Sequence, residues 1–307
     1  MINDIVYNSS DGTRIYAYKW DAQSPKAAVQ VAHGAVEHAL RYEDFAQTLA
    51  KQGFVVYAAD HRGHGKTAGS PDNVPYISDT NKGYSLMVED MKQLTDIIKQ
   101  ETSLPVFLFG HSMGSFLARV YAARYGKELS GLLLTGTGRD NPLLISIGKL
   151  LARLEMALFG RRHRTPFLDS LAFGKQDKPF KGEGRSSFIC SDCDVIAAYR
   201  ADEYCGNTAT AEFIFELLGA LRAGFKNSTF EGCPKDLSVF IGAGEFDSMG
   251  GKKLSGVKKD VECYRRAGVR DIEFHVYEGM RHEILNEKDK QRVYFDIISW
   301  LNKRTKN

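Results

Sequence analysis

The chain has 307 residues, of which 43% are hydrophobic and 26% are charged, as in an ordinary globular protein. Its 41 basic and 38 acidic side chains leave a formal net charge of +3, too balanced to indicate a nucleic-acid partner. No basic, apolar leader opens the chain, and no apolar run approaches the ~20 residues of a membrane span. We therefore expect a cytoplasmic protein, whose five cysteines, an odd number, stay reduced.

The first half of the chain alternates short apolar runs with amphipathic segments. An Asp-Gly pair at residues 11–12 predicts a hairpin between the first two strands. The later runs are almost continuously apolar, as is typical of parallel strands covered on both faces. The predicted strands lie at 3–8, 13–20, 27–32, 54–59 and 106–109, and the predicted helices at 42–52, 85–100 and 115–123.

The second half of the chain contains a long interruption of this alternation. Strands are expected near 132–134, 239–241 and 272–277, and a helix at 290–302. Residues 138–228 contain no convincing strand. They carry instead two stripes of apolar residues at helical spacing, Leu143 to Leu158 and Phe213 to Leu221.

These elements predict an α/β fold with a mostly parallel sheet, helices on both faces and an antiparallel hairpin at its N-terminal edge. We expect a core formed by residues 1–137 and 229–307. Residues 138–228 would form a helical cap, or lid, inserted after the strand near residues 130–135.

The stretch around residues 104–117 carries the clearest chemical signal. An apolar strand ends at GHSMG, residues 110–114, and a helix follows. The motif G-x-S-x-G between a strand and a helix is typical of a nucleophile elbow, in which the turn exposes the serine hydroxyl. Gly110 and Gly114 would make room for the neighbouring backbone. Ser112 is the predicted nucleophile.

A serine nucleophile needs a base and an acid that orients the base. For this kind of elbow the chain order is serine, acid, histidine. Of the three histidines after Ser112, only His282 follows a strand at its C-terminal end, where α/β sites form. Asp247, in the loop after the preceding strand, is the preferred acid, and Glu245 is the alternative.

The oxyanion of an acyl-transfer reaction needs backbone N–H donors. One would be the N–H of Met113, directly after the nucleophile. The second would be the N–H of Ala35, in the small-residue loop after the strand at 27–32. His111 is expected to face away from the site. Grouped histidines at residues 33–38 and 61–64 lack a spaced third ligand, so neither a metal nor a cofactor is expected.

Five blocks of the sequence together resemble the monoacylglycerol lipase and lysophospholipase group of the α/β-hydrolase superfamily. They are HGAVEH with Arg41-Tyr42, DHRGHG, GHSMG, GEFDSMG and YEGMRHEILNE, in the order of that family and over nearly the whole chain. The resemblance implies a serine hydrolase with a helical cap that cleaves esters of lipid-like alcohols. It supports the assignments of Ser112, Asp247, His282, Ala35 and Met113. Val36 stands where the family usually has Gly, which would narrow the acyl entrance.

The sequence therefore predicts hydrolysis of monoacylglycerol-like or lysophospholipid-like esters through an acyl-enzyme. A short-chain carboxylesterase and a serine peptidase or amidase stay open as alternatives. Leu144, Ile147 and Leu151, in the first apolar stripe, are candidate contacts of the acyl chain together with Val36. The basic residues 161–164 would form either a solvated turn or a contact with anionic lipid. Transient contact between the cap and a membrane surface is the remaining partner prediction.

Overall fold

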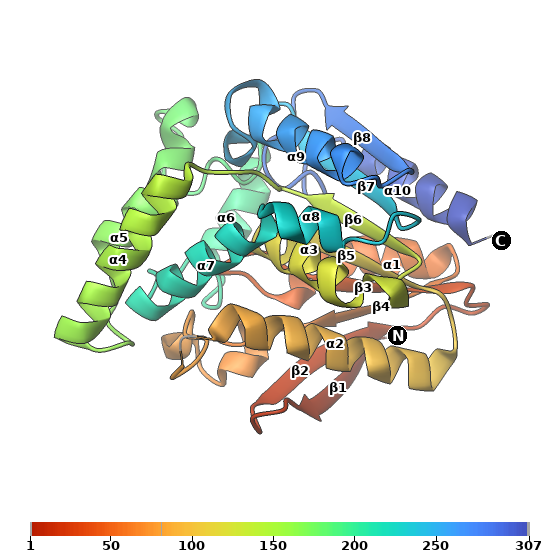
Figure 1. Cartoon of the computed structure of the whole chain (residues 1–307), viewed down its shortest axis with the longest axis horizontal. Coiled ribbons are helices and arrows are strands. Elements are labelled where there is room, and N and C mark those ends of the chain that lie inside the picture. Colours follow the sequence, from red (N-terminus) through yellow and green to blue (C-terminus); the bar gives the residue numbers. More distant parts are fainter. Residues whose placement is uncertain (1, 81, 306–307) are drawn as a thin grey trace.

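The computed structural model describes residues 2–80 and 82–305. Through this part of the chain runs an eight-stranded sheet in the order β1-β2-β4-β3-β5-β6-β7-β8 (Figure 1). The strands are β1 (Ile2–Asn8), β2 (Arg14–Trp20), β3 (Ala27–Ala32), β4 (Phe54–Ala59), β5 (Val106–His111), β6 (Gly131–Thr135), β7 (Ser238–Gly244) and β8 (Ile272–Tyr277). β1 and β2 are antiparallel to their neighbours, whereas β3 to β8 are parallel, which confirms the predicted sheet.

The two faces of the sheet bury different side chains of the same strands. In β5, Phe107 and Phe109 face the helices α1 (Glu43–Lys51) and α10 (Lys290–Arg304). Val106 and Leu108, one residue out of phase, face the opposite layer of helices. Because side chains alternate along a strand, an apolar run covered on both faces needs no polar positions. The continuous apolar composition of β5 follows from its central place.

The opposite layer contains α2 (Gly83–Thr102), α3 (Met113–Tyr125) and α9 (Ser255–Arg266). The sequence predicts α2 and α3, but α9 was missed. Its apolar residues Val257, Val261 and Tyr264 are few and stand among charged side chains. Their spacing of four and three residues places them on one buried face, and it is the signal that could have identified the helix.

The interruption predicted between β6 and β7 is helical. It contains α4 (Pro142–Phe159), α5 (Pro166–Ala172), α6 (Cys193–Ala201), α7 (Ala211–Gly224) and α8 (Asn227–Gly232). In Figure 1 the helices α4 to α7 lie together at one end of the molecule. Phe213 and Ile214 of α7 share a buried cluster with Phe116 of α3, so this region rests on the core. We call residues 138–228 the cap; its division from the core as a domain stays a prediction.

Across residues 2–80 and 82–305, none of the helices combines the length and the apolar character needed to cross a bilayer. The cytoplasmic location stays a prediction. All five cysteines carry free thiols in the structure: Cys190, Cys193, Cys205, Cys233 and Cys263.

Candidate active site

Ser112 stands in the turn between β5 and α3 with φ 50° and ψ −118°, a conformation that non-glycine residues rarely adopt. A Cβ on Gly110 would lie 2.6 Å from the carbonyl oxygen of Gly114. A Cβ on Gly114 would lie 2.1 Å from the carbonyl oxygen of Ala32. Neither position has room for a side chain, so the two glycines permit the sharp turn. The turn leaves Ser112 half-buried at the end of β5.

His282 and Asp247 come from loops that leave two neighbouring parallel strands, β8 and β7, at the same edge of the sheet. Nδ1 of His282 lies 3.0 Å from Oδ1 of Asp247, and both side chains are buried. Oδ1 of Asp247 also accepts a hydrogen bond from the N–H of Met249 at 2.9 Å, which holds the carboxylate in place. Glu245, the alternative acid, is exposed and accepts the N–H of Gly279 instead.

The contact with Asp247 determines which nitrogen of His282 carries the proton. A carboxylate accepts, so Nδ1 donates and Nε2 keeps a free lone pair. Burial lowers the pKa of His282, but the charge of Asp247 and its hydrogen bond, together with the charges of Glu283 and Glu37, raise it above the ordinary 6.5. The side chain thus has the tautomer and the basicity that a general base requires.

The expectation that His111 faces away from the site was wrong. Its ring centroid lies 4.8 Å from that of His282. The reason is that β5 extends to His111, whose side chain follows Phe107 and Phe109 on the same face of the sheet. Burial and the charge of His282 lower the pKa of His111 to about 3. The neutral ring of His111 therefore packs against the more basic ring of His282.

The loop after β3 passes directly beside Ser112, because a Cβ on Gly34 would lie 3.2 Å from Cβ of Ser112. His33 Nε2 accepts the N–H of His61 at 2.9 Å, so Nδ1 carries the proton and donates to the carbonyl of Gly34 at 2.8 Å. Burial and the charge of His61 lower the pKa of His33 far below its ordinary value. The Gly34 carbonyl and the Ala35 N–H belong to one planar peptide, so this neutral histidine holds the Ala35 N–H from the core side of the loop.

Met113 is the first residue of α3, where N–H groups have no partner within the helix. On the opposite side of the loop, Glu37 accepts hydrogen bonds from the N–H of Gly34 and the guanidinium of Arg41. Arg41 also donates twice to Glu283, at 2.7 Å each. The loop after β3 and the loop that holds His282 are therefore joined by a buried ion-pair network.

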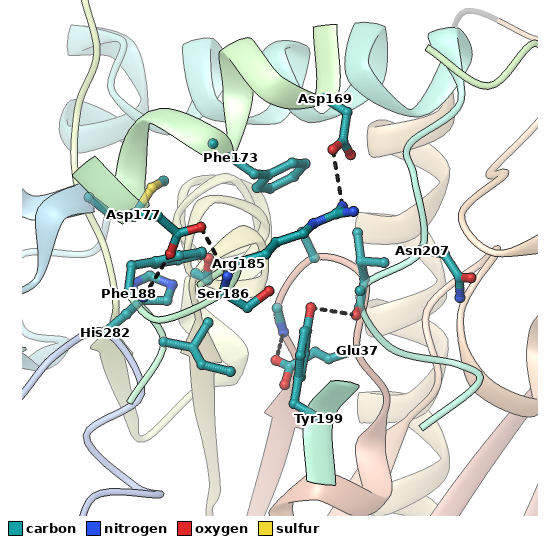
Figure 2. A pocket seen from close by; sticks show the side chains of 18 of the residues that line it. Glu37, Asp169, Phe173, Asp177, Arg185, Ser186, Phe188, Tyr199, Asn207 and His282 are labelled. Atoms are coloured by element: carbon teal, nitrogen blue, oxygen red, sulfur yellow. Dashed lines mark hydrogen bonds and ion pairs between the residues drawn. The ribbon is translucent and has the colours of Figure 1, made fainter. Parts of the chain in front are cut away.

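A cavity of about 320 Å³ lies between these loops and the cap. Ser112, His282 and Val36 line its core side, and Phe188 and Phe173 line its cap side. Figure 2 shows Arg185 extended across the cavity toward Asp169 of α5. The two side chains form an ion pair at 3.2 Å.

The other three candidate acyl contacts lie elsewhere on the cap. Leu144 and Ile147 of α4 are 56% and 45% exposed, and Leu151 is half-buried. None of them lines the cavity beside Ser112. The buried face of α4 is narrow, with Ile145 and Ala152 as its fully buried residues, so the leucine stripe points outward. Contact between this stripe and an acyl chain stays a prediction.

The arginines of the basic turn contact the core, so the turn is not a freely solvated one, while its contact with anionic lipid stays a prediction. Arg161 and Arg164 donate hydrogen bonds to backbone carbonyls of the core segment 72–80. The guanidinium of Arg162 lies 3.7 Å above the ring of Tyr76. The sequence could not show this because the carbonyls lie about 90 positions earlier in the chain. The turn fastens the cap to the core.

Among the described residues, one group could offer three metal ligands within 4.8 Å of one another: His38, Asp202 and Cys205. His38 Nε2 already forms a hydrogen bond of 2.8 Å with Asp202 Oδ2. Burial raises the pKa of the Cys205 thiol, which disfavours the thiolate that metals bind. This cluster is better explained as a link between the cap and the loop after β3.

Among the residues of the site that sequence reasoning did not single out, Tyr199 and Glu283 contact the loop after β3 and Arg41 directly. Tyr199, on α6, donates its hydroxyl to the carbonyl of Val36 at 3.1 Å. Glu283 pairs with Arg41, and its place directly after His282 was its only signal. No signal marked Tyr199, because its role depends on how the cap sits over the loop after β3.

A family model described as "serine aminopeptidase, S33" matches residues 23–289. The monoacylglycerol lipase of Mycolicibacterium smegmatis is 28% identical over 94% of this chain and 93% of that protein. The monoglyceride lipase of Homo sapiens is 27% identical over 97% of this chain and 89% of that protein. Among solved structures, a thermostable carboxyl esterase from Bacillus coagulans in complex with glycerol superposes with a TM-score of 0.90, at 29% identity and 99% coverage of both chains.

Proposed function

The chain belongs to the serine aminopeptidase S33 family, and on this premise we propose that it hydrolyses carboxylic esters of lipid-like substrates, of monoacylglycerol or lysophospholipid type. The observation that carries the proposal is the hydrogen bond between His282 and Asp247, together with the cavity that Ser112 and His282 both line. The relatives named as monoacylglycerol lipases and the structural neighbour named as a carboxyl esterase support it.

In the first half of the proposed reaction, Oγ of Ser112 attacks the ester carbonyl carbon while Nε2 of His282 takes the hydroxyl proton. The imidazolium that forms is stabilised by Asp247. The carbonyl electrons move to the oxygen, where the N–H groups of Ala35 and Met113 donate hydrogen bonds. The bond to the alcohol oxygen then breaks, and His282 returns its proton to the leaving alcohol.

The second half releases the acyl chain from Ser112. Water enters, His282 takes one of its protons, and the resulting hydroxide adds to the acyl carbon. The same two N–H donors hold the second oxyanion. When the intermediate collapses, Ser112 regains its proton from His282 and the carboxylic acid leaves. Neither half requires a metal or a cofactor.

The second candidate is a serine peptidase or amidase, which the description of the family favours. It would use the same groups, because an amide nitrogen can accept the proton of His282 as an alcohol oxygen does. A carboxylesterase for short acyl chains is the third reading. The leaving group and the acyl length distinguish the three.

The cap adds a proposed contact with the surface of the lipid substrate. Six leucine and isoleucine side chains of α4 are between 45% and 74% exposed. Exposed apolar groups gathered on one helix face are typical of surfaces that bind proteins or lipids. Long-chain esters aggregate in water, so an apolar face on the cap would hold the enzyme against its substrate.

The first test is labelling of the purified protein with a fluorophosphonate probe, followed by turnover of esters and amides that share an acyl chain. Labelling should disappear in Ser112→Ala. His282→Ala should retain the melting temperature and lose at least ~10³-fold in kcat, since members of such a triad act as a unit. Undiminished labelling of Ser112→Ala would contradict the assignment. Faster turnover of the amides than of the esters would favour the peptidase.

A further inference from the structure

Val36 has an unusual backbone conformation for its type. It is buried, with φ 53°, in the left-handed region that β-branched residues strongly avoid. Such a conformation is strained and persists where surrounding contacts hold it. Val36 directly follows Ala35, whose N–H is the proposed oxyanion donor. The conformation of Val36 therefore influences a catalytic group.

The contacts that hold Val36 come from the cap. Its carbonyl oxygen accepts a hydrogen bond from the hydroxyl of Tyr199 at 3.1 Å and another from the N–H of Gly206 at 3.0 Å. Gly206 has φ 65°, and a Cβ there would lie 3.1 Å from the ring of Tyr199. The two donors are thus packed against each other and converge on one acceptor.

The loop is held at both of its ends. On the core side, His33 donates to the carbonyl of Gly34 and Glu37 accepts the N–H of Gly34. On the cap side, the donors described above hold the carbonyl of Val36. The Ala35 N–H lies between these two fixed points. Loss of the cap-side donors would allow the strained Val36 to relax and the Ala35 N–H to turn.

We propose that Tyr199 is a positioning residue for the oxyanion hole. Its hydroxyl, with the N–H of Gly206, holds the carbonyl of Val36 so that the N–H of Ala35 points at the oxygen of the tetrahedral intermediate. The proposal rests on the function proposed above. It makes the cap a supporting part of the catalytic centre in addition to a cover over the cavity.

Tyr199 is itself fixed from the core. The guanidinium of Arg41 lies 4.8 Å from the centre of its ring, and Arg41 is held by Glu37 and Glu283. Burial raises the pKa of Tyr199 well above the ordinary value, so the hydroxyl keeps the proton it donates. The ring therefore keeps its place when the hydroxyl is removed, which makes Tyr199→Phe an informative variant.

The test compares Tyr199→Phe with wild type on a soluble ester. We expect kcat to fall about tenfold, less than the 10²–10³ lost when a donor is removed outright, with KM unchanged within about twofold. Labelling by a fluorophosphonate, whose phosphoryl oxygen occupies the same hole, should slow by the same factor. The melting temperature should stay within about 2 °C. The matched control is Tyr204→Phe in the same segment, since the ring of Tyr204 lies against His38; it should behave as wild type.

A second background separates positioning from a general packing effect. Glycine adopts a positive φ without strain, so in Val36→Gly the loop needs less support from Tyr199. The loss caused by Tyr199→Phe should therefore be clearly smaller in the Val36→Gly background than in wild type. An equal loss in both backgrounds would contradict the inference, as would a Tyr199→Phe variant that changes KM alone or nothing. Wild-type protein that neither reacts with the probe nor cleaves esters would instead contradict the proposed function and, with it, this inference.

Discussion

Neighbouring histidines of this protein have opposite acid–base properties because of what surrounds them. His33 and His111 are buried, and burial together with nearby histidine charges lowers the pKa of each. His282 is equally buried, yet Asp247 outweighs the burial and raises its pKa. One carboxylate thus sets a single ring apart from the others, and this ring is the proposed base. The rings around it stay neutral and serve as hydrogen-bond donors or packing surfaces.

The raised pKa of His282 predicts how the proposed reaction depends on pH. The base must be unprotonated, so kcat/KM should fall tenfold per pH unit below the pKa of His282, and the inflection should lie above 6.5. In Asp247→Asn the inflection should move to lower pH, because the charge that raises the pKa is gone. Measurement of kcat/KM from about pH 5 to 9 on a soluble ester tests both statements. A wild-type inflection below 6.5, or the same inflection in both proteins, would contradict them.

At the scale of elements, α7 is joined to the core by two buried carboxylates. Glu212 accepts the N–H of Ile77 and Glu216 accepts the N–H of Tyr84, both at 3.0 Å. Tyr84 lies in the first turn of α2, where the helix dipole favours a negative charge. Burial, and secondarily the charge of Glu216, raises the pKa of Glu212 to about 8. The attachment of α7 therefore depends on protonation.

The raised pKa of Glu212 gives a prediction for stability. The folded state holds this proton more tightly than the unfolded state, whose pKa is near 4.5, so the contribution of Glu212 to stability is full at low pH and is lost as pH rises from about 4.5 to 8. In Glu212→Gln the loss of unfolding free energy between low and high pH should be smaller by about 2 kcal/mol or more, since one pKa unit corresponds to about 1.4 kcal/mol.

Urea unfolding at about pH 5 and pH 8 measures this difference. The control is Glu231→Gln, an exposed change on α8, which should keep the pH dependence of wild type. The same pH dependence in Glu212→Gln and wild type would show that Glu212 does not carry the effect.

Helices and strands with one long apolar pattern could be predicted from the sequence, and contacts across the cap could not. The spacing of Val106 to Phe109 specifies a buried strand, and the glycines of GHSMG specify the turn after it. The pairing of His282 with Asp247 followed from chain order at the edge of a parallel sheet. The outward direction of the α4 leucines had no signal, because a stripe at helical spacing looks alike whether it covers a core or faces solvent.

At the scale of the whole molecule, α4 lies at the cap end, and α10 lies on another side (Figure 1). Within α4, Leu143, Leu150, Leu154 and Leu158 are 66%, 58%, 50% and 74% exposed. Each leucine buried in a lipid surface would contribute of order 1 kcal/mol or more. The stripe is long enough to attach the cap to an aggregate of substrate.

Replacement of these four leucines by glutamine should lower binding to phosphatidylcholine vesicles, and turnover of dispersed long-chain monoacylglycerol, by about tenfold or more. Turnover of a soluble short-chain ester should not change, because the side chains are exposed and lie outside the cavity. Vesicle co-sedimentation and parallel assays measure the two effects. The control is Phe295→Gln, a change of an exposed residue on α10. The proposed lipid contact would be contradicted if vesicle binding fell equally in both variants, or if it did not fall in the quadruple variant.

The backbone N–H groups of His282 and Glu283 donate to the carbonyls of Phe188 and Ile189, which belong to the cap. This arrangement limits how the protein can be recombined with its relatives. A chimera that imports a whole foreign cap would keep these two hydrogen bonds only where the imported backbone places its carbonyls at the positions of 188 and 189. Inheriting residues 188–206 and the turn 161–164 with the sheet would preserve the backbone contacts described above, and α4 and α5 would be the parts to exchange in order to change substrate preference.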